Sequence, residues 1–238
     1  MKKTVVALCS ILIWLSGCSG VQPSSSGYEY EINIAEIRDD ELLVELTFRG
    51  HLGDASRFCL PKIVPGIYDA LNYGRFVNEL EAFGDKGRAL AVHRTDINCW
   101  EIQGARNAVT VKYKVNDGWE NFDFQGIRPY RSSESHFDSA VVILNANAVF
   151  GYFLGKEHFP FRITVKKPES FYGATSLTKT RSTEGQDEYV APNYRALVDS
   201  PIMYSRPDTV TLELPGISVG VASYSTSGQK IANELAQY

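Results

Sequence analysis

Apolar and polar residues alternate over short stretches along most of the chain, which is the pattern of half-buried β-strands. Residues 28–37 alternate strictly, and residues 42–49 and 108–115 follow the same period. Further strands are predicted at residues 58–63, 99–102, 140–144, 149–154, 161–167 and 209–214. Short strands at this spacing predict an all-β fold, in which antiparallel sheets pack as a β-sandwich.

One helix is predicted, at the C-terminus. Residues 229–238 place Ile231, Leu235 and Tyr238 on one helical face, and Ser227 is the expected N-cap. The fold class is therefore an antiparallel β-sandwich with a short C-terminal helix.

The N-terminus has the features of a targeting segment. Lys2 and Lys3 precede an apolar run at residues 5–15, which is too short to cross a bilayer core of about 30 Å as a helix. The run ends in Leu-Ser-Gly-Cys, which resembles the lipobox of bacterial lipoproteins, so Cys18 is expected to carry a lipid. The alternative is an ordinary signal peptide with an incidental cysteine.

The expected location is the bacterial cell envelope. Ser19 after the cysteine resembles the signal for the outer membrane, so the body should face the periplasm on a lipid anchor. Residues 1–17 form the signal peptide in this interpretation, and the Ser-rich residues 18–27 form a flexible tether.

Two cysteines remain in the body of the chain. Cys59 and Cys99 are an even pair in an oxidising compartment, which predicts a disulfide between them. The alternative is two buried reduced thiols, because a domain of this length can build its core without a covalent link.

Composition and charge exclude several classes of protein. With 238 residues, 44% hydrophobic and 22% charged, the chain is an ordinary globular protein. A net charge of −4 argues against a nucleic-acid partner, which would require a basic face. The sequence has no His-Glu-x-x-His, Cys-x-x-Cys, Gly-x-Ser-x-Gly or P-loop motif. No catalytic residue and no metal ligand is therefore assigned.

One polar stretch has residue types suited to acid–base chemistry. Glu134, His136 and Asp138 lie close together in a Ser-rich stretch. This composition is more typical of a solvated loop, which is the expected structure.

Two segments are unusual in their residue order. Residues 60–68 combine two prolines and a Pro-Gly pair with apolar residues, which predicts a rigid loop. Residues 191–202 place Asp199 directly before Ser200 and Pro201, where the carboxylate is expected to brace a turn.

Together these segments resemble the N-terminal domain of the glycyl-aminopeptidase-like zinc metallopeptidases, peptidase family sixty-one. Residues 60–68 match its Leu-Pro-x-Trp-x-Pro-Gly-x-Tyr stretch, except that Ile63 replaces the tryptophan. Residues 193–201 match its Asn-Tyr-Asp-Glu-Leu-Val-Asp-Ser-Pro stretch, except that Arg195 and Ala196 replace the acidic pair. Further matches are Tyr73, Arg75, Val77, Gly87 and Trp100.

The resemblance implies a domain division and a missing part. Residues 28–226 would form the β domain, and residues 227–238 would begin a truncated helical domain. In the family that second domain carries the zinc-binding His-Glu-x-x-His, so no cofactor is expected here. The resemblance therefore implies a non-catalytic domain of an aminopeptidase-like protein. Tyr194, Asp199, Ser200 and Pro201 are the candidate cleft or domain-interface residues, and a peptidase domain in trans or a peptide substrate is the expected partner.

A free-standing lipoprotein that binds a peptide, glycan or protein is the alternative function. Its support is a set of aromatic residues that could form an exposed platform, namely Trp119, Phe122, Phe124, Tyr130, Tyr152 and Phe153. Burial in the core of the sheets is the more common role of such residues.

Overall fold

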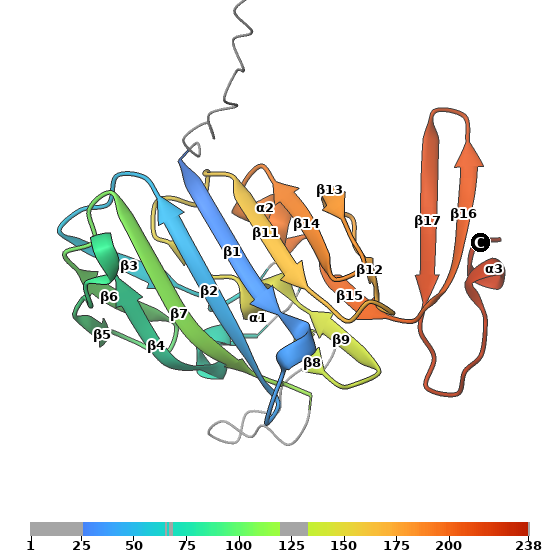
Figure 1. Cartoon of the computed structure of the whole chain (residues 1–238), viewed down its shortest axis with the longest axis horizontal. Coiled ribbons are helices and arrows are strands. Elements are labelled where there is room, and N and C mark those ends of the chain that lie inside the picture. Colours follow the sequence, from blue (N-terminus) through green and yellow to red (C-terminus); the bar gives the residue numbers. More distant parts are fainter. Residues whose placement is uncertain (1–25, 65, 67–68, 120–132, 238) are drawn as a thin grey trace, which may run out of the picture.

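The computed structural model describes residues 26–64, 66, 69–119 and 133–237 (Figure 1). The predicted signal peptide, Cys18 and nearly all of the tether lie outside these residues, so those expectations stay predictions. Within the described ranges, no helix has the length and apolar character needed to cross a membrane.

The main layer is a seven-stranded sheet, ordered β13-β14-β11-β1-β2-β7-β4 (Figure 1). Its strands are β1 (Gly27–Asn33), β2 (Glu41–Arg49), β4 (Val77–Phe83), β7 (Ala108–Asn116), β11 (Phe161–Lys166), β13 (Thr178–Ser182) and β14 (Gln186–Ala191). Neighbours pair antiparallel except β1 and β11, which are parallel. The prediction of antiparallel sheets is confirmed apart from this pair, which no local sequence signal marks.

Two four-stranded sheets, ordered β10-β3-β6-β5 and β12-β15-β9-β8, provide the remaining strands of the sandwich. They consist of β3 (Ala55–Cys59), β5 (Val92–Arg94), β6 (Cys99–Gln103), β8 (His136–Phe137), β9 (Val141–Leu144), β10 (Tyr152–Phe153), β12 (Tyr172–Ala174) and β15 (Ile202–Ser205). In the part of the chain that the structure describes, three 3-10 turns connect strands: η1 (Ile34–Glu36), η2 (Tyr73–Phe76) and η3 (Asp85–Gly87).

Several tyrosines bury their rings in the core, and their hydroxyl groups form hydrogen bonds with the backbone of residues 149–153. Tyr30 donates to the carbonyl of Gly151 at 2.6 Å, and Tyr113 donates to that of Val149 at 2.7 Å. Tyr28 accepts from the amide of Phe153 at 2.9 Å. These tyrosine hydroxyls thus supplement the backbone hydrogen bonds of α1 and β10 along residues 149–153.

Cys59 and Cys99 are joined by a disulfide, as predicted. They face each other on the antiparallel strands β3 and β6, with 4.2 Å between their Cα atoms. By the chain-entropy model, closing a loop of this length stabilises the fold by about 3–4 kcal/mol.

Two short helices were not predicted. The strand expected at residues 149–154 is α1 (Ala146–Val149) followed by β10, because Asn145 caps the helix by accepting from the amide of Asn147 at 3.0 Å. α2 (Tyr194–Val198) begins after Asn193, whose side chain accepts from the amide of Ala196 at 2.9 Å. The expectation of a single C-terminal helix was wrong for these two segments.

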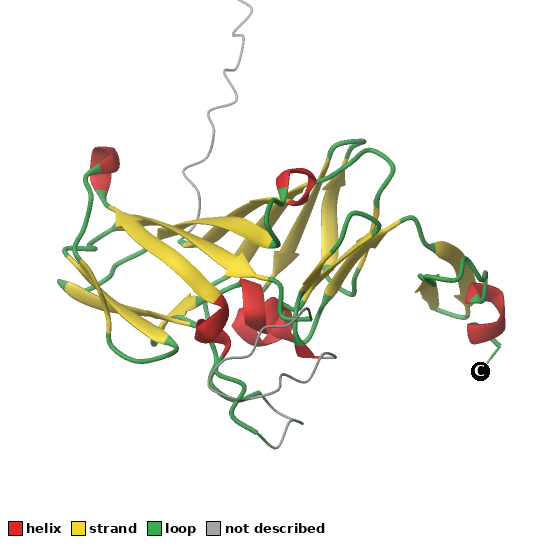
Figure 2. Cartoon of the chain, turned by 90° about the horizontal axis from the view of Figure 1, so that it is seen from below, coloured by secondary structure: helices red, strands yellow, loops and turns green. Residues whose placement is uncertain are grey.

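The C-terminal part is a hairpin set apart from the sandwich along the long axis of the molecule (Figures 1 and 2). β16 (Asp208–Leu214) and β17 (Ile217–Ser223) pair with each other, and α3 (Ala232–Leu235) lies beside them. The predicted helix is present but shorter than expected. The residue before α3 is Ile231 rather than Ser227, whose hydroxyl bonds Ser225 instead.

Candidate functional site

The candidate site is a group of buried charged side chains and half-buried rings, here called the Arg75 cluster. It contains Arg75 from η2, Asp117 and Trp119 from the turn after β7, Glu134 from the residues before β8, and His136 from β8 itself. These residues come from three segments that are distant in the sequence. The cluster includes Arg75 of the family motif and two residues of the stretch expected to be a solvated loop.

The position of Arg75 is fixed by the backbone around Gly74. A β-carbon on Gly74 would lie 2.3 Å from the carbonyl oxygen of Ile97, so only glycine allows η2 to approach the residues before β6 this closely. The amide of Gly74 donates to Asn98 Oδ1 at 3.1 Å, and Arg94 Nη2 donates to the Gly74 carbonyl at 2.8 Å. This tight packing directs the next side chain, that of Arg75, into the interior.

Arg75 and Glu134 form a buried ion pair. Arg75 Nη2 lies 2.8 Å from Glu134 Oε1, and both side chains are 0% exposed. Arg75 Nε, Arg75 Nη1 and Glu134 Oε2 have no hydrogen-bond partner within the described part of the chain. Buried donors and acceptors cost free energy when they have no hydrogen-bond partner. An ordered water is the smallest group that would accept from the Arg75 N–H groups and donate to Glu134 Oε2 at the same time.

Burial controls the titration of Glu134. Loss of solvent raises the pKa of this carboxyl from 4.5 to about 7, against the opposing effect of the Arg75 guanidinium. Gly118 packs directly against the Glu134 side chain, because a β-carbon on Gly118 would lie only 2.8 Å from Glu134 Cβ. Glu134 is therefore a buried carboxyl that titrates near neutral pH.

Asp117 organises the other half of the cluster. Its Oδ2 lies 3.0 Å from His136 Nδ1 and accepts from the amide of Phe137 at 2.6 Å, and its Oδ1 accepts from the amide of Trp119 at 2.6 Å. The Trp119 ring stacks on His136 with centroids 4.6 Å apart. Two of the three Asp117 contacts are with backbone amides, so this carboxylate joins the β7 turn to β8.

The expected solvated loop at residues 132–136 was wrong for the described residues. Glu134 and Ser135 are both 1% exposed, and the Ser135 hydroxyl accepts from the amide of Asn145 at 3.0 Å. The stretch is buried because Arg75 and Asp117 supply charged partners that its polar composition does not reveal.

The predicted interface segment at residues 194–201 divides into a buried and an exposed part. Tyr194 is buried and donates to the carbonyl of Phe150 at 3.0 Å. Ser200 is also buried, donates to the carbonyl of Ala196 at 3.0 Å, and accepts from Ser176 at 2.8 Å. Asp199 and Pro201 are exposed. The buried pair therefore supports α2, and the role of the segment at a cleft or interface stays a prediction.

The proposed aromatic platform is not assembled by its described members. Phe153 is buried in the core, Tyr152 is half-buried against Tyr194 with ring centroids 4.5 Å apart, and Trp119 belongs to the Arg75 cluster. Phe122, Phe124 and Tyr130 lie outside the described residues.

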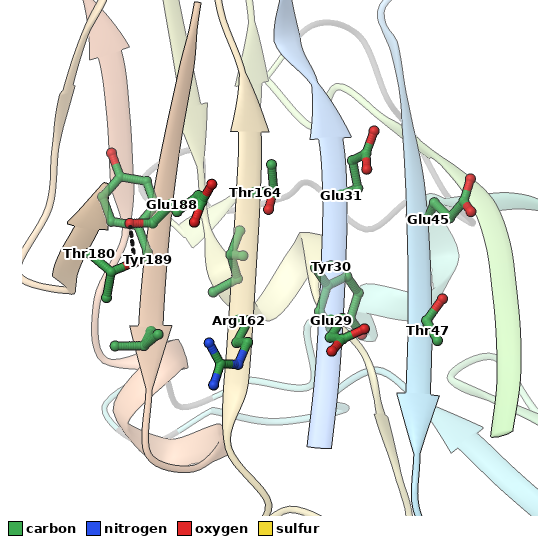
Figure 3. A pocket seen from close by; sticks show the side chains of 12 residues that line it. Glu29, Tyr30, Glu31, Glu45, Thr47, Arg162, Thr164, Thr180, Glu188 and Tyr189 are labelled. Atoms are coloured by element: carbon green, nitrogen blue, oxygen red, sulfur yellow. Dashed lines mark hydrogen bonds between the residues drawn. The ribbon is translucent and has the colours of Figure 1, made fainter. Parts of the chain in front are cut away.

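A shallow groove of about 300 Å³ crosses the outer face of the seven-stranded sheet (Figure 3). Its polar lining residues are Glu29, Glu31, Glu45, Thr47, Arg162, Thr164, Thr180 and Glu188. Cross-strand ion pairs occupy several of these groups, including Arg49 with Glu29 at 3.3 Å and Lys166 with Glu31. Because exposed pairs of this kind contribute little free energy, we interpret the groove as the solvated face of the sheet.

The described residues do not fit a zinc ion. No group of three or more His, Cys, Asp or Glu side chains gathers among them in a way that could hold a metal. In the Arg75 cluster, one carboxylate is paired with a guanidinium and the other bonds backbone amides, so neither is free to act as a ligand.

The fold of this chain is similar to part of solved structures of other proteins. An aminopeptidase N family protein from Idiomarina loihiensis is 20% identical with a TM-score of 0.73, and the match covers 88% of this chain and 35% of that one. An M1 zinc metallopeptidase from Deinococcus radiodurans is 13% identical with a TM-score of 0.42, covering 90% of this chain and 53% of that one. The chain thus spans about a third of the first protein and half of the second. No curated protein sequence matches it significantly.

The sequence itself identifies the family. Residues 29–206 match the domain described as the Peptidase M61 N-terminal domain, and this region covers well over half of the chain. It includes every strand from β2 to β15 and therefore both motif segments and the Arg75 cluster. The chain belongs to the Peptidase M61 N-terminal domain family.

Proposed function

We propose that this chain is the non-catalytic N-terminal domain of a lipid-anchored, aminopeptidase-like protein of the bacterial cell envelope. The observation that carries the proposal is the family match over residues 29–206, a region whose described side chains offer no metal-binding group. Its charged residues are used to hold segments together, as in the Arg75–Glu134 pair.

The envelope location rests on two features. Cys18 follows a short apolar segment in a lipobox-like sequence, and Cys59 and Cys99 form a disulfide, which is common in oxidising compartments. In this proposal the lipid holds the sandwich at the outer membrane, facing the periplasm, through the Ser-rich tether.

The experiment that tests the missing activity uses the purified chain with peptides that begin with Gly or Ala. We expect no release of the N-terminal residue, with or without added zinc, while a zinc aminopeptidase assayed alongside releases it. Metal-dependent release that co-purifies with the chain through successive columns would overturn the proposal.

The anchor is tested separately by fractionation and mass spectrometry. We expect the wild-type chain in the membrane fraction with a lipid mass on Cys18, and a Cys18→Ser variant without either. Cys9→Ser is the matched control, because Cys9 lies inside the predicted signal peptide and should not change the fractionation. A Cys18→Ser chain that still carries lipid would contradict the anchor.

A further inference from the structure

The two cysteines of the disulfide are covered to different extents. A pocket of about 410 Å³ lies beside the disulfide, and its described lining includes Cys99 but not Cys59. Cys59 is only 2% exposed, whereas Cys99 is half-buried. A disulfide is opened by attack of a thiolate on one of its sulfurs, so access to each sulfur helps to decide which one reacts. Cys99 is therefore the accessible end of this bond.

The strands around the disulfide explain this difference. Cys59 ends β3, which pairs with β6 on one side and with β10 on the other, so it faces Cys99 and Tyr152. Cys99 begins β6, one residue before the last pair that β6 makes with β5, which is Trp100 with Arg94. Cys59 is thus enclosed by a strand on each side, whereas Cys99 lies where β5 has stopped pairing.

The charged groups at the pocket favour an anionic attacking group. Lys62 and Asp96 are the charged residues in its described lining. The Asp96 carboxylate is paired, because Arg57 Nη2 lies 3.2 Å from its Oδ2. Its Oδ1 accepts from the amides of Asn98 and Cys99 at 2.7 and 3.0 Å. Lys62 is exposed and has no ion-pair partner among the described residues, so it presents a positive charge to an approaching thiolate.

Other contacts hold the same strands together without the disulfide. β3 and β6 form a ladder of five residue pairs, of which Cys59 with Cys99 is the last. Beyond this pair, the amide of Leu60 donates to the carbonyl of Asn98 at 2.9 Å, and the Asn98 side chain accepts from the amide of Gly74 at 3.1 Å. We therefore expect the sandwich to stay folded while the bond between the sulfurs is open.

We propose that Cys99 Sγ is a site of reversible thiol–disulfide exchange, at which a dithiol reductant opens the Cys59–Cys99 bond in the folded chain. A thiolate of the reductant attacks Cys99 Sγ, the bond to Cys59 Sγ breaks, and Cys59 leaves as a thiolate that takes up a proton. The second thiolate of the reductant then attacks the reductant's own sulfur in the mixed disulfide. Cys99 leaves and is protonated, and the reductant is oxidised to its disulfide as two electrons pass to the chain. The exchange uses groups of the sandwich alone, so it goes beyond the proposed function and does not depend on it.

Reduction kinetics test whether the folded chain reacts. The purified full chain is treated with dithiothreitol, quenched with N-ethylmaleimide and analysed by mass spectrometry for labelled Cys59 and Cys99. We expect a rate proportional to the dithiothreitol concentration. Relative to the reduction of oxidised glutathione in the same solution, this rate should stay constant at urea concentrations that leave the circular dichroism of the β-sheets intact.

Two results of this experiment would overturn the proposal. A relative rate that rises steeply with urea below the unfolding transition would mean that the bond opens only when the chain unfolds. Loss of the β-sheet signal on reduction would mean that the folded chain does not survive the exchange.

A monothiol identifies the sulfur that is attacked. The chain is treated with 2-mercaptoethanesulfonate, and the cysteine released is trapped with N-ethylmaleimide. We expect the monothiol on Cys99 and the maleimide on Cys59, in about tenfold excess over the reverse arrangement, because access differs between the two sulfurs. Comparable amounts of the two products, or an excess with the monothiol on Cys59, would contradict attack at Cys99.

Two lysine variants test the path of approach. Lys62→Gln should slow the reaction with the anionic 2-mercaptoethanesulfonate by about two- to fivefold, and it should not slow the reaction with the cationic cysteamine. Lys86→Gln is the matched control, since Lys86 is also exposed but does not line the pocket, and it should change neither rate. An unchanged rate for Lys62→Gln with the anionic thiol would mean that the thiol does not approach through this pocket, which overturns the proposal.

Discussion

The sandwich and the C-terminal hairpin contain the same alternation of apolar and polar residues but bury it to different extents. Leu46 and Val111, on neighbouring strands of the seven-stranded sheet, are both 0% exposed. Leu214 and Ile217, at equivalent alternate positions in the hairpin, are more than half exposed. Alternation thus marks a face that is suited to burial. Whether that face is covered depends on a second layer, which the sandwich has within its own chain.

The two regions also differ in the burial of their charged side chains. The sandwich buries complete charged groups, such as Arg75 with Glu134 and Asp187 with the hydroxyls of Tyr189 and Tyr204. On the hairpin strand β16, Glu213 is exposed and accepts from the Ser218 hydroxyl at 2.9 Å, and Asp208 is only half-buried. Substitutions of buried residues in the sandwich should therefore have large effects on stability, and substitutions of the exposed apolar residues of the hairpin should have small ones.

The largest effect is expected for Arg75→Ala. At pH 8, where the carboxyl of Glu134 is ionised in the folded wild type, removing the guanidinium leaves this carboxylate buried without its partner, which should lower the free energy of unfolding by about 3–5 kcal/mol. Urea unfolding followed by circular dichroism measures this loss. Arg162→Ala is the matched control, since Arg162 is exposed on β11, and it should change stability by less than about 0.5 kcal/mol.

A double variant separates pairing from packing. Arg75→Met with Glu134→Leu removes both charges and keeps apolar volume, so it should be clearly more stable than Arg75→Ala. A double variant as unstable as Arg75→Ala would show that the guanidinium matters through its shape and contacts rather than through its charge.

An intermediate effect is expected from pH. The pKa of Glu134 is about 7 in the folded chain because of burial, against 4.5 as its ordinary value, so the folded state holds a proton between these values that the unfolded state releases. The stability from this group is complete below pH 4.5 and is lost as the pH rises through 7. Between pH 5 and pH 8 the loss should be about 1–3 kcal/mol.

Glu134→Gln isolates this contribution, because the amide does not titrate and can still accept from Arg75. The difference in unfolding free energy between the wild type and this variant should fall with rising pH over this range. A difference that rises instead would mean that pairing with Arg75 outweighs burial in setting the charge of Glu134.

Much of the fold could be predicted because strands are local patterns. The alternation in residues 42–49 and 108–115 corresponds to β2 and β7, whose register keeps the apolar positions on one face. The parallel pairing of β1 with β11 joins residues more than 130 positions apart, and no local pattern specifies it. The helix α2 was missed because its signal is one capping residue, Asn193, in a segment of only five helical residues.

The candidate site was harder to predict because its residues are distant in the sequence and no local pattern links them. Glu134 belongs to a polar stretch that is typical of a loop, and its partner Arg75 lies 59 positions earlier. Such a stretch can be buried only because the fold brings an oppositely charged side chain, here that of Arg75, next to it. The available signal was Arg75 itself, which occupies a motif position next to a glycine and two aromatic residues.

The smallest effect is expected for Leu214→Ser combined with Ile217→Ser, and this result would sharpen the comparison most. Both side chains are already more than half exposed, so the purified chain loses little burial, and the unfolding free energy of the sandwich should change by less than about 0.5 kcal/mol. Leu46→Ala, at a fully buried position of β2, should cost about 2–5 kcal/mol in the same urea titration. Comparable losses in the two variants would mean that the hairpin folds as part of the sandwich, which would remove the reason for placing it in a separate structural unit. A difference of this size would instead mean that the sandwich folds without help from the exposed side chains of Leu214 and Ile217, so that the hairpin and the sandwich are energetically separate.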